Sequence, residues 1–385
     1  MTSFQFQSVA ILGSTGSVGE QALDVARAHH IPVVGLVASR NWKRVAEQTR
    51  EFAVPYVAMA DADAAKELRV ALADTKTCVL AGEDGIEALL RGCGAKVALN
   101  AILGKAGLIP TLTALDEGMD VALANKESLV VAGDVVMQKA REKGCRITPV
   151  DSEHSAIFQA LRAGAHAEIK RVILTASGGP FFGRTRESLA NVTVREALAH
   201  PTWQMGAKIT VDSATMMNKG FEIIEAAHLF DLSPDQIDVV VHRESIIHSM
   251  VEYIDNSVIA QMSVPDMRLC VQYALTAPIR TSAVIPPLDL LSVGKLSFHA
   301  PDEEAFPLLS LAKRALLAGG AAPAVLNAAN EVAVASFLAG EISMLTLFDV
   351  VERVVTKMPH AAKCFTLQEI LDADRAAREL TKAYL

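Results

Sequence analysis

Short apolar runs alternate with segments of helical periodicity through the first part of the chain. Residues 8–12 and 33–38 are continuous apolar runs, a pattern typical of strands that are buried on both faces. Similar runs follow at residues 56–59, 78–80, 97–99, 121–124 and 147–150. Helical patterns such as 62–72 and 109–118 lie between them. This alternation predicts an open parallel sheet, that is, a Rossmann-like α/β domain over residues 1–150.

The pattern changes after residue 150. A strand over 171–175, followed by alternating patterns over 239–250 and 257–262, predicts an α+β connective and catalytic domain at residues 151–276. A proline-rich linker is expected at residues 277–301. A C-terminal helical domain is expected at residues 302–385, with helices over 308–317, 324–338 and 367–383. The predicted fold class is therefore α/β, with a parallel-sheet domain, an α+β domain and a helical domain in that order.

A polar cluster stands out at residues 211–225, which read VDSATMMNKGFEIIE. The apolar Ile209 and Val211 predict a short strand that turns into a helix near Asp212 and Ser213. Either polar side chain could cap the helix by accepting one of the free N–H groups of its first turn. The sequence therefore predicts a strand, a capped turn and a helix in succession.

Helical spacing places Asn218 and Lys219 beside Glu222 on the surface of that predicted helix. An amide, an ammonium and a carboxylate would then lie next to a helix start, whose free N–H groups and dipole attract anions. This combination suits an anionic substrate beside a metal ion. The alternative is an ordinary amphipathic helix with a good cap and a Lys–Glu surface pair.

A glycine-rich turn follows the first predicted strand and precedes a helical pattern. Gly13, Gly16 and Gly19 are spaced three and three, a variant of the dinucleotide-binding fingerprint. After the second strand, where an NAD-selective site usually has a carboxylate, the chain has Arg40. An arginine suits the 2′-phosphate of NADPH, so NADPH is favoured over NADH. The alternatives are a structural turn for the glycines and a solvated cation for Arg40.

Acidic residues follow the last strand of the predicted sheet. Asp151 and Glu153 lie two apart at the strand end and project to the same side. With Glu222 they could offer three oxygen ligands to Mg²⁺ or Mn²⁺. The alternative is a common helix start, because acidic residues stabilise a first turn by roughly 0.3–1 kcal/mol.

A segment rich in glycine and proline, at about residues 177–207, contains Trp203, one of two tryptophans. It predicts a mobile lid that excludes water on closure. The alternative is a long surface loop whose Trp203 packs inward. Asn327, Asn330 and Glu331 could be functional, or they could be buried or capping polar groups.

Composition excludes several classes of protein. The formal net charge of -8, without a dense Lys/Arg run, argues against a nucleic-acid partner. No apolar stretch reaches the roughly 20 residues that span a bilayer, and no secretory signal is expected. The five cysteines are scattered and form no C-x-x-C pair, so neither a disulfide framework nor a zinc site is expected. A cytoplasmic protein with a small-molecule substrate fits best.

Several motifs together resemble the 1-deoxy-D-xylulose 5-phosphate reductoisomerase family. They are Gly13-Ser-Thr-Gly-Ser-Val-Gly19, Ala124-Asn-Lys-Glu-Ser128, Pro149-Val-Asp-Ser-Glu-His154, Ser177-Gly-Gly-Pro-Phe181, His200-Pro-Thr-Trp203, Asp212-Ser-Ala-Thr-Met-Met-Asn-Lys-Gly220 and Leu326-Asn-Ala-Ala-Asn-Glu331. The resemblance covers essentially the whole chain. It implies a homodimer with an NADPH domain, a catalytic domain with a flexible loop, and a helical domain. It also implies conversion of 1-deoxy-D-xylulose 5-phosphate to 2-C-methyl-D-erythritol 4-phosphate, in the non-mevalonate route to isoprenoid precursors.

The resemblance also implies roles for individual residues. The implied metal ligands, for Mg²⁺, Mn²⁺ or Co²⁺, are Asp151, Glu153 and Glu222, and these count as catalytic together with Lys219 and His200. The implied substrate contacts are Ser152, Glu153, Ser177, His200, Ser213, Asn218, Lys219 and Glu222. The implied cofactor contacts are Ser14, Thr15, Gly16, Ser17, Val18, Ser39, Arg40, Asn41, Asn125, Lys126, Glu127 and Gly206. Trp203 and Met205 would belong to the closing loop.

The sequence departs from the usual family pattern at three places. Ser39 stands where the family usually has glycine, and Arg40 where lysine is frequent, which puts the detail of the 2′-phosphate contact in doubt. His242-Arg-Glu-Ser245 replaces the usual His-Pro-Gln-Ser. None of the three touches an expected metal or phosphate ligand.

Two other classes of function remain open from the residues alone. A semialdehyde or sugar-phosphate dehydrogenase would share the sheet but would not need three convergent carboxylates. The semialdehyde type would also need a nucleophilic cysteine in a polar turn, which Cys93 and Cys145 do not offer. A nucleotide-sensing binding protein would have no use for a metal cluster and a lid.

Overall fold

The computed structural model describes residues 6–358 and 366–385. Its contacts divide the chain into two compact units, each built from several segments. Unit 1 comprises Met1–Ser128, Val136–Ser155 and Asp266–Pro286, and unit 2 comprises Leu129–Val135, Ala156–Pro265 and Pro287–Leu385. Residues 1–5, on which the expectation of no secretory signal partly rests, lie outside the described residues. Cys364 also lies outside them. The remaining four cysteines are free thiols.

Unit 1 is built on a seven-stranded parallel sheet. In sheet order β4-β3-β2-β1-β5-β6-β7, the strands are Cys78–Ala81, Tyr56–Met59, Val33–Ala38, Val9–Leu12, Val97–Asn100, Asp120–Leu123 and Ile147–Pro149. All four residues of β1 are buried, as expected for a strand covered on both faces. The predicted strands are therefore confirmed to within a residue or two at their ends.

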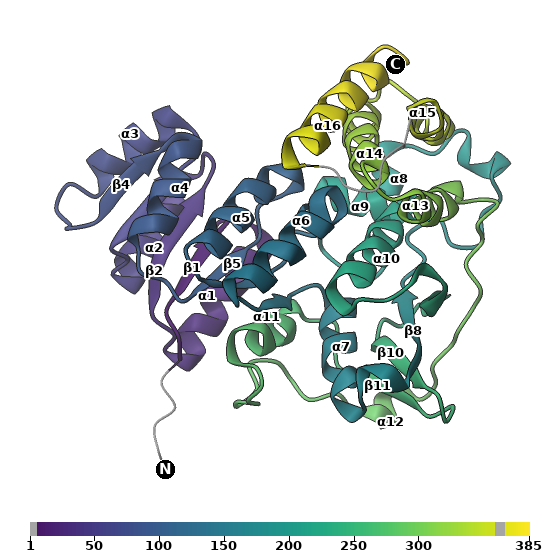
Figure 1. Cartoon of the computed structure of the whole chain (residues 1–385), viewed down its shortest axis with the longest axis horizontal. Helices are drawn as coiled ribbons and strands as arrows, with labels where there is room; N and C mark the ends of the chain where they lie inside the picture. The colour runs from purple at the N-terminus through teal and green to yellow at the C-terminus, as the bar shows by residue number, and fades with distance from the viewer. Residues whose placement is uncertain (1–5, 359–365) are drawn as a thin grey trace. The chain divides into compact units, whose positions relative to one another are not determined.

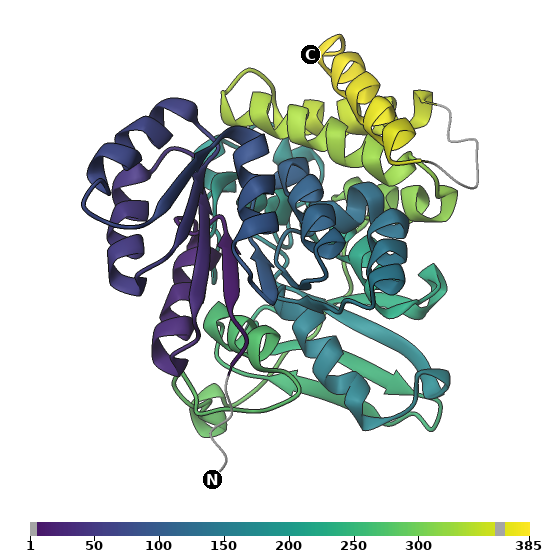
Figure 2. The ribbon, with the colours of Figure 1, turned by 60° about the vertical axis from the view of Figure 1, so that its left-hand side comes forward.

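All but the last of the helices of unit 1 connect strands of this sheet, and the last, at residues 267–276, packs against the first (Figures 1 and 2). They are α1 (Ser17–His29), α2 (Trp42–Phe52), α3 (Ala62–Ala71), α4 (Gly82–Gly92), α5 (Leu108–Asp116) after the 3-10 turn η1 (Gly104–Gly107), and α11 (Met267–Thr276). Helices α6 (Glu127–Lys143) and α7 (Ser152–Ala160) each have residues in both units. Helix α6 has a kink at Ala132, where φ is -144°.

The order of the strands reverses between β1 and β5, because the chain adds β2 to β4 on one side of β1 and β5 to β7 on the other. Crossovers between parallel strands are right-handed, so the helices of the two halves cover opposite faces. Such a switch point leaves a crevice at the carboxyl ends of the two central strands, where sheets of this kind bind ligands. The glycine turn after β1 lies at this position.

Unit 2 combines a four-stranded mixed sheet with helices. In sheet order β11-β10-β8-β9, the strands are Val258–Met262, Ile247–Tyr253, Ile169–Ala176 and Ile237–Val241. Strands β8 and β9 are parallel, and the other pairs are antiparallel. Short 3-10 turns η2 (Leu161–Ala163), η3 (His166–Glu168), η4 (Glu187–Leu189) and η5 (Pro234–Gln236) connect the elements.

The remaining helices belong to unit 2. They are α8 (Val194–Ala197), α9 (Ala207–Ala214), α10 (Met217–Phe230), α12 (Leu290–Val293), α13 (Pro307–Ala318), α14 (Ala322–Leu338), α15 (Met344–Lys357) and α16 (Leu367–Lys382). The last four form the green-to-yellow group of helices in Figure 1. The expected helical C-terminal region is thus confirmed, while the exact three-domain boundaries stay a prediction.

The strand predicted at Ile209 and Val211 is wrong, because these residues lie within helix α9. Two alternating β-branched residues are too short a pattern to distinguish a strand from a helix. Here Thr210 donates a side-chain hydrogen bond to the carbonyl of Gly206, one turn earlier, at 2.9 Å. The predicted caps are wrong for the same reason, since Asp212 and Ser213 lie in the last turn of α9 rather than at the start of α10.

Among the described residues, no helix is both long enough and apolar enough to cross a lipid bilayer.

Candidate active site

The turn that follows β1 packs tightly against the end of β5. Gly13 has a φ of +87°, and a Cβ at this position would lie 2.7 Å from the carbonyl oxygen of Ala101. A Cβ on Gly19, in the first turns of α1, would collide with the backbone of Gly13 and Ser14. The turn therefore requires glycine for its conformation and for its close approach to the helix. Helix α1 starts at Ser17, so its free N–H groups face the turn.

A buried side chain from α2 supports this turn. Gln48 donates hydrogen bonds to the carbonyl oxygen of Ser14, at 3.0 Å, and to the carboxylate of Glu20, at 2.8 Å. Arg44 forms a bidentate pair with the same carboxylate. Since Arg44 is held in this way, its guanidinium supports the turn through Glu20.

Arg40 and Asn41 follow β2 at the carboxyl edge of the same sheet. The Arg40 side chain is 84% exposed and forms an ion pair with Asp61 at 3.1 Å, through its Nε. Because this pair uses Nε, the two terminal nitrogens can still donate to an anion. Asn41 caps helix α2, because its side-chain oxygen accepts the N–H of Arg44.

Asn125 organises the loops that follow β5 and β6. Its amide nitrogen donates to the carbonyl oxygens of Ile102, at 2.6 Å, and Gly104, at 2.8 Å, and its oxygen accepts the N–H of Ser128. The amide hydrogens are therefore used within the protein. Asn125 is thereby suited to shaping the loop beside a cofactor.

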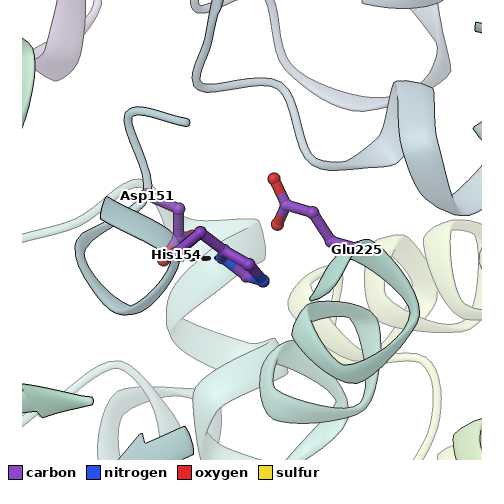
Figure 3. Close-up of side chains that lie close together, drawn as sticks. All are labelled: Asp151, His154 and Glu225. Carbon is purple, nitrogen blue, oxygen red and sulfur yellow. Dashed lines mark ion pairs between the residues drawn. The ribbon is translucent and has the colours of Figure 1, made fainter. Parts of the chain in front are cut away.

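Polar residues at the ends of neighbouring parallel strands meet next to Asp151. The ammonium of Lys126, which follows β6, lies 2.6 Å from a carboxylate oxygen of Asp151, which follows β7. The Nδ1 atom of His154 lies 3.6 Å from a carboxylate oxygen of Asp151 (Figure 3). Burial alone would raise the pKa of Asp151, but Lys126 and His154 outweigh it and hold that pKa well below its usual range. Asp151 is therefore ionised at neutral pH.

Glu153 completes the acidic group of unit 1. One of its carboxylate oxygens lies within 4.8 Å of a carboxylate oxygen of Asp151. The hydroxyl of Ser152 donates to Glu153 at 2.6 Å. Two carboxylates at this spacing can share a divalent cation.

Helix α10 of unit 2 carries the polar patch expected from helical spacing. Asn218 donates to the Glu222 carboxylate at 2.5 Å, and the ammonium of Lys219 forms an ion pair with its other oxygen. Both charged side chains of this pair are nearly fully buried. The prediction that Glu222 lies beside both residues is confirmed, and the alternative of an exposed surface pair is wrong. Glu225, also drawn in Figure 3, is buried on the same helix.

Ser177 and His200 form a hydrogen-bonded pair in unit 2. The Nδ1 atom of His200 accepts the backbone N–H groups of Thr202, at 3.2 Å, and Trp203, at 2.9 Å. The ring proton must therefore reside on Nε2, which donates to the Ser177 oxygen at 2.9 Å. Burial, with a smaller contribution from the charge of Arg243, lowers the pKa of His200 to about 4. The ring is thus neutral at pH 7.

The Ser177 hydroxyl is oriented by a second donor, the backbone N–H of Gly179, at 3.2 Å. Because its oxygen accepts two hydrogen bonds, its own hydrogen is directed elsewhere and can serve an anionic ligand. The same turn packs on helix α9, since a Cβ on Gly179 would lie 2.7 Å from the carbonyl oxygen of Ser213. The turn of residues 177–179, His200 and Ser213 therefore form one group next to the start of α10.

Models of known families match most of the chain. The model described as "1-deoxy-D-xylulose 5-phosphate reductoisomerase" matches residues 9–133, and the model of that enzyme's C-terminal domain matches residues 147–230. A further model, "DXP reductoisomerase C-terminal domain", matches residues 262–380.

Curated relatives and solved structures agree with these models. The chain is 50% identical to the reductoisomerase of Acetivibrio thermocellus over 97% of this chain and 98% of that protein. It is 49% identical to that of Pelodictyon phaeoclathratiforme over 98% and 100% of the two chains. The chain belongs to the 1-deoxy-D-xylulose 5-phosphate reductoisomerase family. The resemblance in the motifs is thereby confirmed, and the chain is an oxidoreductase.

Two solved reductoisomerases have the same fold over nearly the whole chain. The enzyme from Zymomonas mobilis, in complex with NADPH, has a TM-score of 0.92 at 41% identity and covers 98% of this chain and 99% of its own. A second reductoisomerase, in complex with NADPH, fosmidomycin and magnesium, has a TM-score of 0.92 at 38% identity, with 98% of each chain covered. The predicted fold class of this reductoisomerase family member is confirmed.

The site residues predicted from the motifs fall into sets within each unit. In unit 1 the predicted cofactor contacts other than Gly206 follow strands β1, β2 and β6, and Lys126 pairs with Asp151 next to Glu153. Gly206 instead precedes helix α9 in unit 2. In unit 2 the predicted substrate contacts Ser177, His200 and Ser213 lie together, as do Asn218, Lys219 and Glu222. Their individual roles stay predictions.

Four supporting residues escaped the sequence-based prediction. Gln48 carries no signal, because a polar residue within a helix is common. His154 follows the acidic pair and could have been found as its neighbour. Arg243 lies just beyond the end of a strand, at an edge where parallel strands bind ligands. His248 is buried, which lowers its pKa to about 4, and its ring centre lies 6.3 Å from that of Trp203 in the predicted loop.

Proposed function

We propose that the protein converts 1-deoxy-D-xylulose 5-phosphate to 2-C-methyl-D-erythritol 4-phosphate with NADPH and a divalent metal ion. The reaction would rearrange the carbon skeleton to a branched aldehyde, which then accepts a hydride. It would serve the non-mevalonate route to isoprenoid precursors. Relatives of about 50% identity over nearly the full length carry this enzyme's name.

The observation that carries the proposal is the set of side chains around Ser177, His200 and the start of α10 in unit 2. An oriented serine hydroxyl, a neutral histidine and a helix start with a buried Lys–Glu pair lie in one part of the chain. These groups suit a phosphate and its neighbouring hydroxyls. A dehydrogenase acting on an uncharged substrate would have no need for them.

The carboxylates fit a small divalent cation, because Mg²⁺ and Mn²⁺ prefer oxygen ligands and an ionised Asp151 is already available. We propose that Asp151, Glu153 and Glu222 hold this ion together, with Mg²⁺ or Mn²⁺ as the first candidates and Co²⁺ as a third. When bound, the ion would polarise the substrate carbonyl and stabilise the negative charge that develops on its oxygen. Lys126 would keep Asp151 oriented toward it.

The side chains of unit 2 would bind and orient the sugar phosphate. Ser177 would donate its free hydrogen to a phosphate oxygen, and Lys219, Asn218 and Ser213 would hold the phosphate or neighbouring hydroxyls. The phosphate is remote from the bonds that change, so its binding energy can be used for orientation and for closure of the loop at residues 177–207. Ser152 and His200 would also contact the substrate.

The reaction can be tested directly with the purified protein. NADPH oxidation should require both 1-deoxy-D-xylulose 5-phosphate and Mn²⁺ or Mg²⁺. EDTA should stop the reaction because it removes the metal ion that would polarise the substrate carbonyl. Product identity would be checked by NMR. The absence of NADPH oxidation when substrate and metal are both present would falsify the proposal, and so would an oxidation rate that EDTA leaves unchanged.

Substitution of Arg40 by aspartate should narrow the preference for NADPH over NADH by about 10- to 100-fold. A charge-assisted contact with the 2′-phosphate contributes roughly 1.5–3 kcal/mol, and that contact would become repulsive. The measurement is the ratio of kcat/KM for the two cofactors.

Lys66→Asp is the matched control for this substitution. Lys66 is 71% exposed and pairs with Asp63 at 2.7 Å, much as Arg40 pairs with Asp61. The control should leave the cofactor ratio unchanged. An unchanged ratio in Arg40→Asp would assign the 2′-phosphate to other residues.

A homodimer in the cytoplasm is also proposed, as the family resemblance implies. The outer strand β11 supports a protein contact, because it is at the edge of its sheet and exposes Val258 and Ile259. An edge strand with exposed apolar side chains is a ready surface for pairing with another chain.

A further inference from the structure

Two turns of unit 2 lie side by side because two parallel strands end at the same edge. Strand β8 ends at Ala176 and strand β9 at Val241, and these two residues are partners in the register. The backbone N–H of His242 donates to the carbonyl of Ala176 at 2.7 Å, which extends the pairing beyond the strands. The turn that contains Arg243 is therefore adjacent to the turn of residues 177–179.

Arg243 binds the backbone of that neighbouring turn. The expectation that the departure at residues 242–245 touches no phosphate ligand is therefore wrong, because Ser177 is one of the expected substrate contacts. The Nη1 atom of Arg243 donates to the carbonyl oxygen of Ser177 at 2.7 Å and to that of Gly179 at 2.8 Å. The guanidinium group also lies 5.0 Å from the centre of the Phe182 ring. One side chain thus holds both ends of the turn.

The turn depends on such support because two of its residues lack side chains. Gly178 and Gly179 both have positive φ, +74° and +64°, a region that glycine enters easily and also leaves easily. With both carbonyls directed to Arg243, the N–H of Gly179 remains aligned with the Ser177 hydroxyl. The orientation of that hydroxyl therefore depends on Arg243.

We propose that Arg243 is a positioning residue for the substrate phosphate, which it serves by fixing the turn of residues 177–179 and by adding positive charge beside it. This inference rests on the proposed function. The charge matters because the protein has a net charge of -8, so an anionic substrate needs a locally basic pocket.

Three substitutions separate hydrogen bonding from charge. Arg243→Met removes both, Arg243→Gln keeps N–H donors without charge, and Arg243→Lys keeps the charge and a donor. We expect Arg243→Met to raise KM for the sugar phosphate by about 10- to 100-fold, with kcat within about threefold and KM for NADPH unchanged. Lysine should restore most of the loss, and glutamine should give an intermediate KM.

Arg353→Met is the matched control. Arg353, on α15 of the same unit, also lies over an aromatic ring, 4.0 Å from the centre of Tyr384. Its replacement should leave KM for the sugar phosphate unchanged. Inorganic phosphate serves as a second probe, and its inhibition constant should rise by the same factor as KM in Arg243→Met.

The outcomes separate this inference from the proposed function. Failure of the wild-type protein to turn over the sugar phosphate counts against the proposed function. Turnover by the wild type, with unchanged KM and phosphate inhibition in folded Arg243→Met, overturns the role of Arg243. If the methionine variant does not fold, the other two variants decide. A KM for the sugar phosphate and a phosphate inhibition constant equal to those of the wild type in both Arg243→Gln and Arg243→Lys would overturn the role equally.

Discussion

Glu222→Gln is expected to lower kcat by roughly a thousandfold or more, because a metal ligand supplies several kcal/mol of transition-state stabilisation. Glutamine keeps the shape of the side chain and a partner for Asn218, but it removes the negative charge. The nearly buried ammonium of Lys219 then loses its counter-charge as well. Affinity for Mn²⁺ should fall with kcat, while the dissociation constant for NADPH should remain close to that of the wild type.

The measurements are turnover with saturating Mn²⁺, Mn²⁺ binding by electron paramagnetic resonance, and NADPH binding by fluorescence. Glu252→Gln is the matched control, because Glu252 is also a buried glutamate paired with cations, Lys170 and Arg171, each at 2.6 Å. That variant should lose stability and keep its turnover. Turnover of Glu222→Gln within about tenfold of the wild type would rule out the assigned ligand.

Gly13→Ala should weaken NADPH binding by about 100-fold or more. An L-residue in the left-handed region costs roughly 1–2 kcal/mol, and the added methyl group would also collide with the carbonyl oxygen of Ala101. Relief of that collision must move the turn away from the end of β5. The N–H groups that would bind the cofactor phosphates then lose their alignment.

Gly82→Ala separates strain from collision. Gly82 has a similar φ of +75°, but a Cβ there meets nothing within 4 Å. This control should lose only the roughly 1–2 kcal/mol of backbone strain in thermal unfolding, less than Gly13→Ala, and it should keep its NADPH affinity in a fluorescence titration. Equal affinity in the two variants would mean that the close packing of Gly13 on Ala101 has no part in cofactor binding.

Patterns within short stretches were enough for much of the fold. Buried strands in a doubly covered sheet appear as continuous apolar runs, so β1 and β2 could be located from local sequence. Helical spacing likewise placed Asn218 and Lys219 beside Glu222. These features depend on residues that are close along the chain.

Helix α9 shows where local pattern fails. Ile209 and Val211 alternate as in a strand, yet the segment is helical and ends before Met216, whose φ of +62° separates α9 from α10. The burial of α9 against the rest of unit 2 outweighs the preference of two β-branched residues. Ser213 consequently lies on one helix and Lys219 on the next.

Local patterns were enough to predict the fold class, the glycine turn and the chemical types of the site residues, because each depends on the spacing of residues close along the chain. Which distant groups meet depends on how the strands are arranged in the folded protein. Lys126 reaches Asp151 because β6 and β7 are neighbours, and Arg243 reaches the turn of residues 177–179 because β8 and β9 end together. Strand order is set by packing between segments far apart in the chain, and no local pattern encodes it.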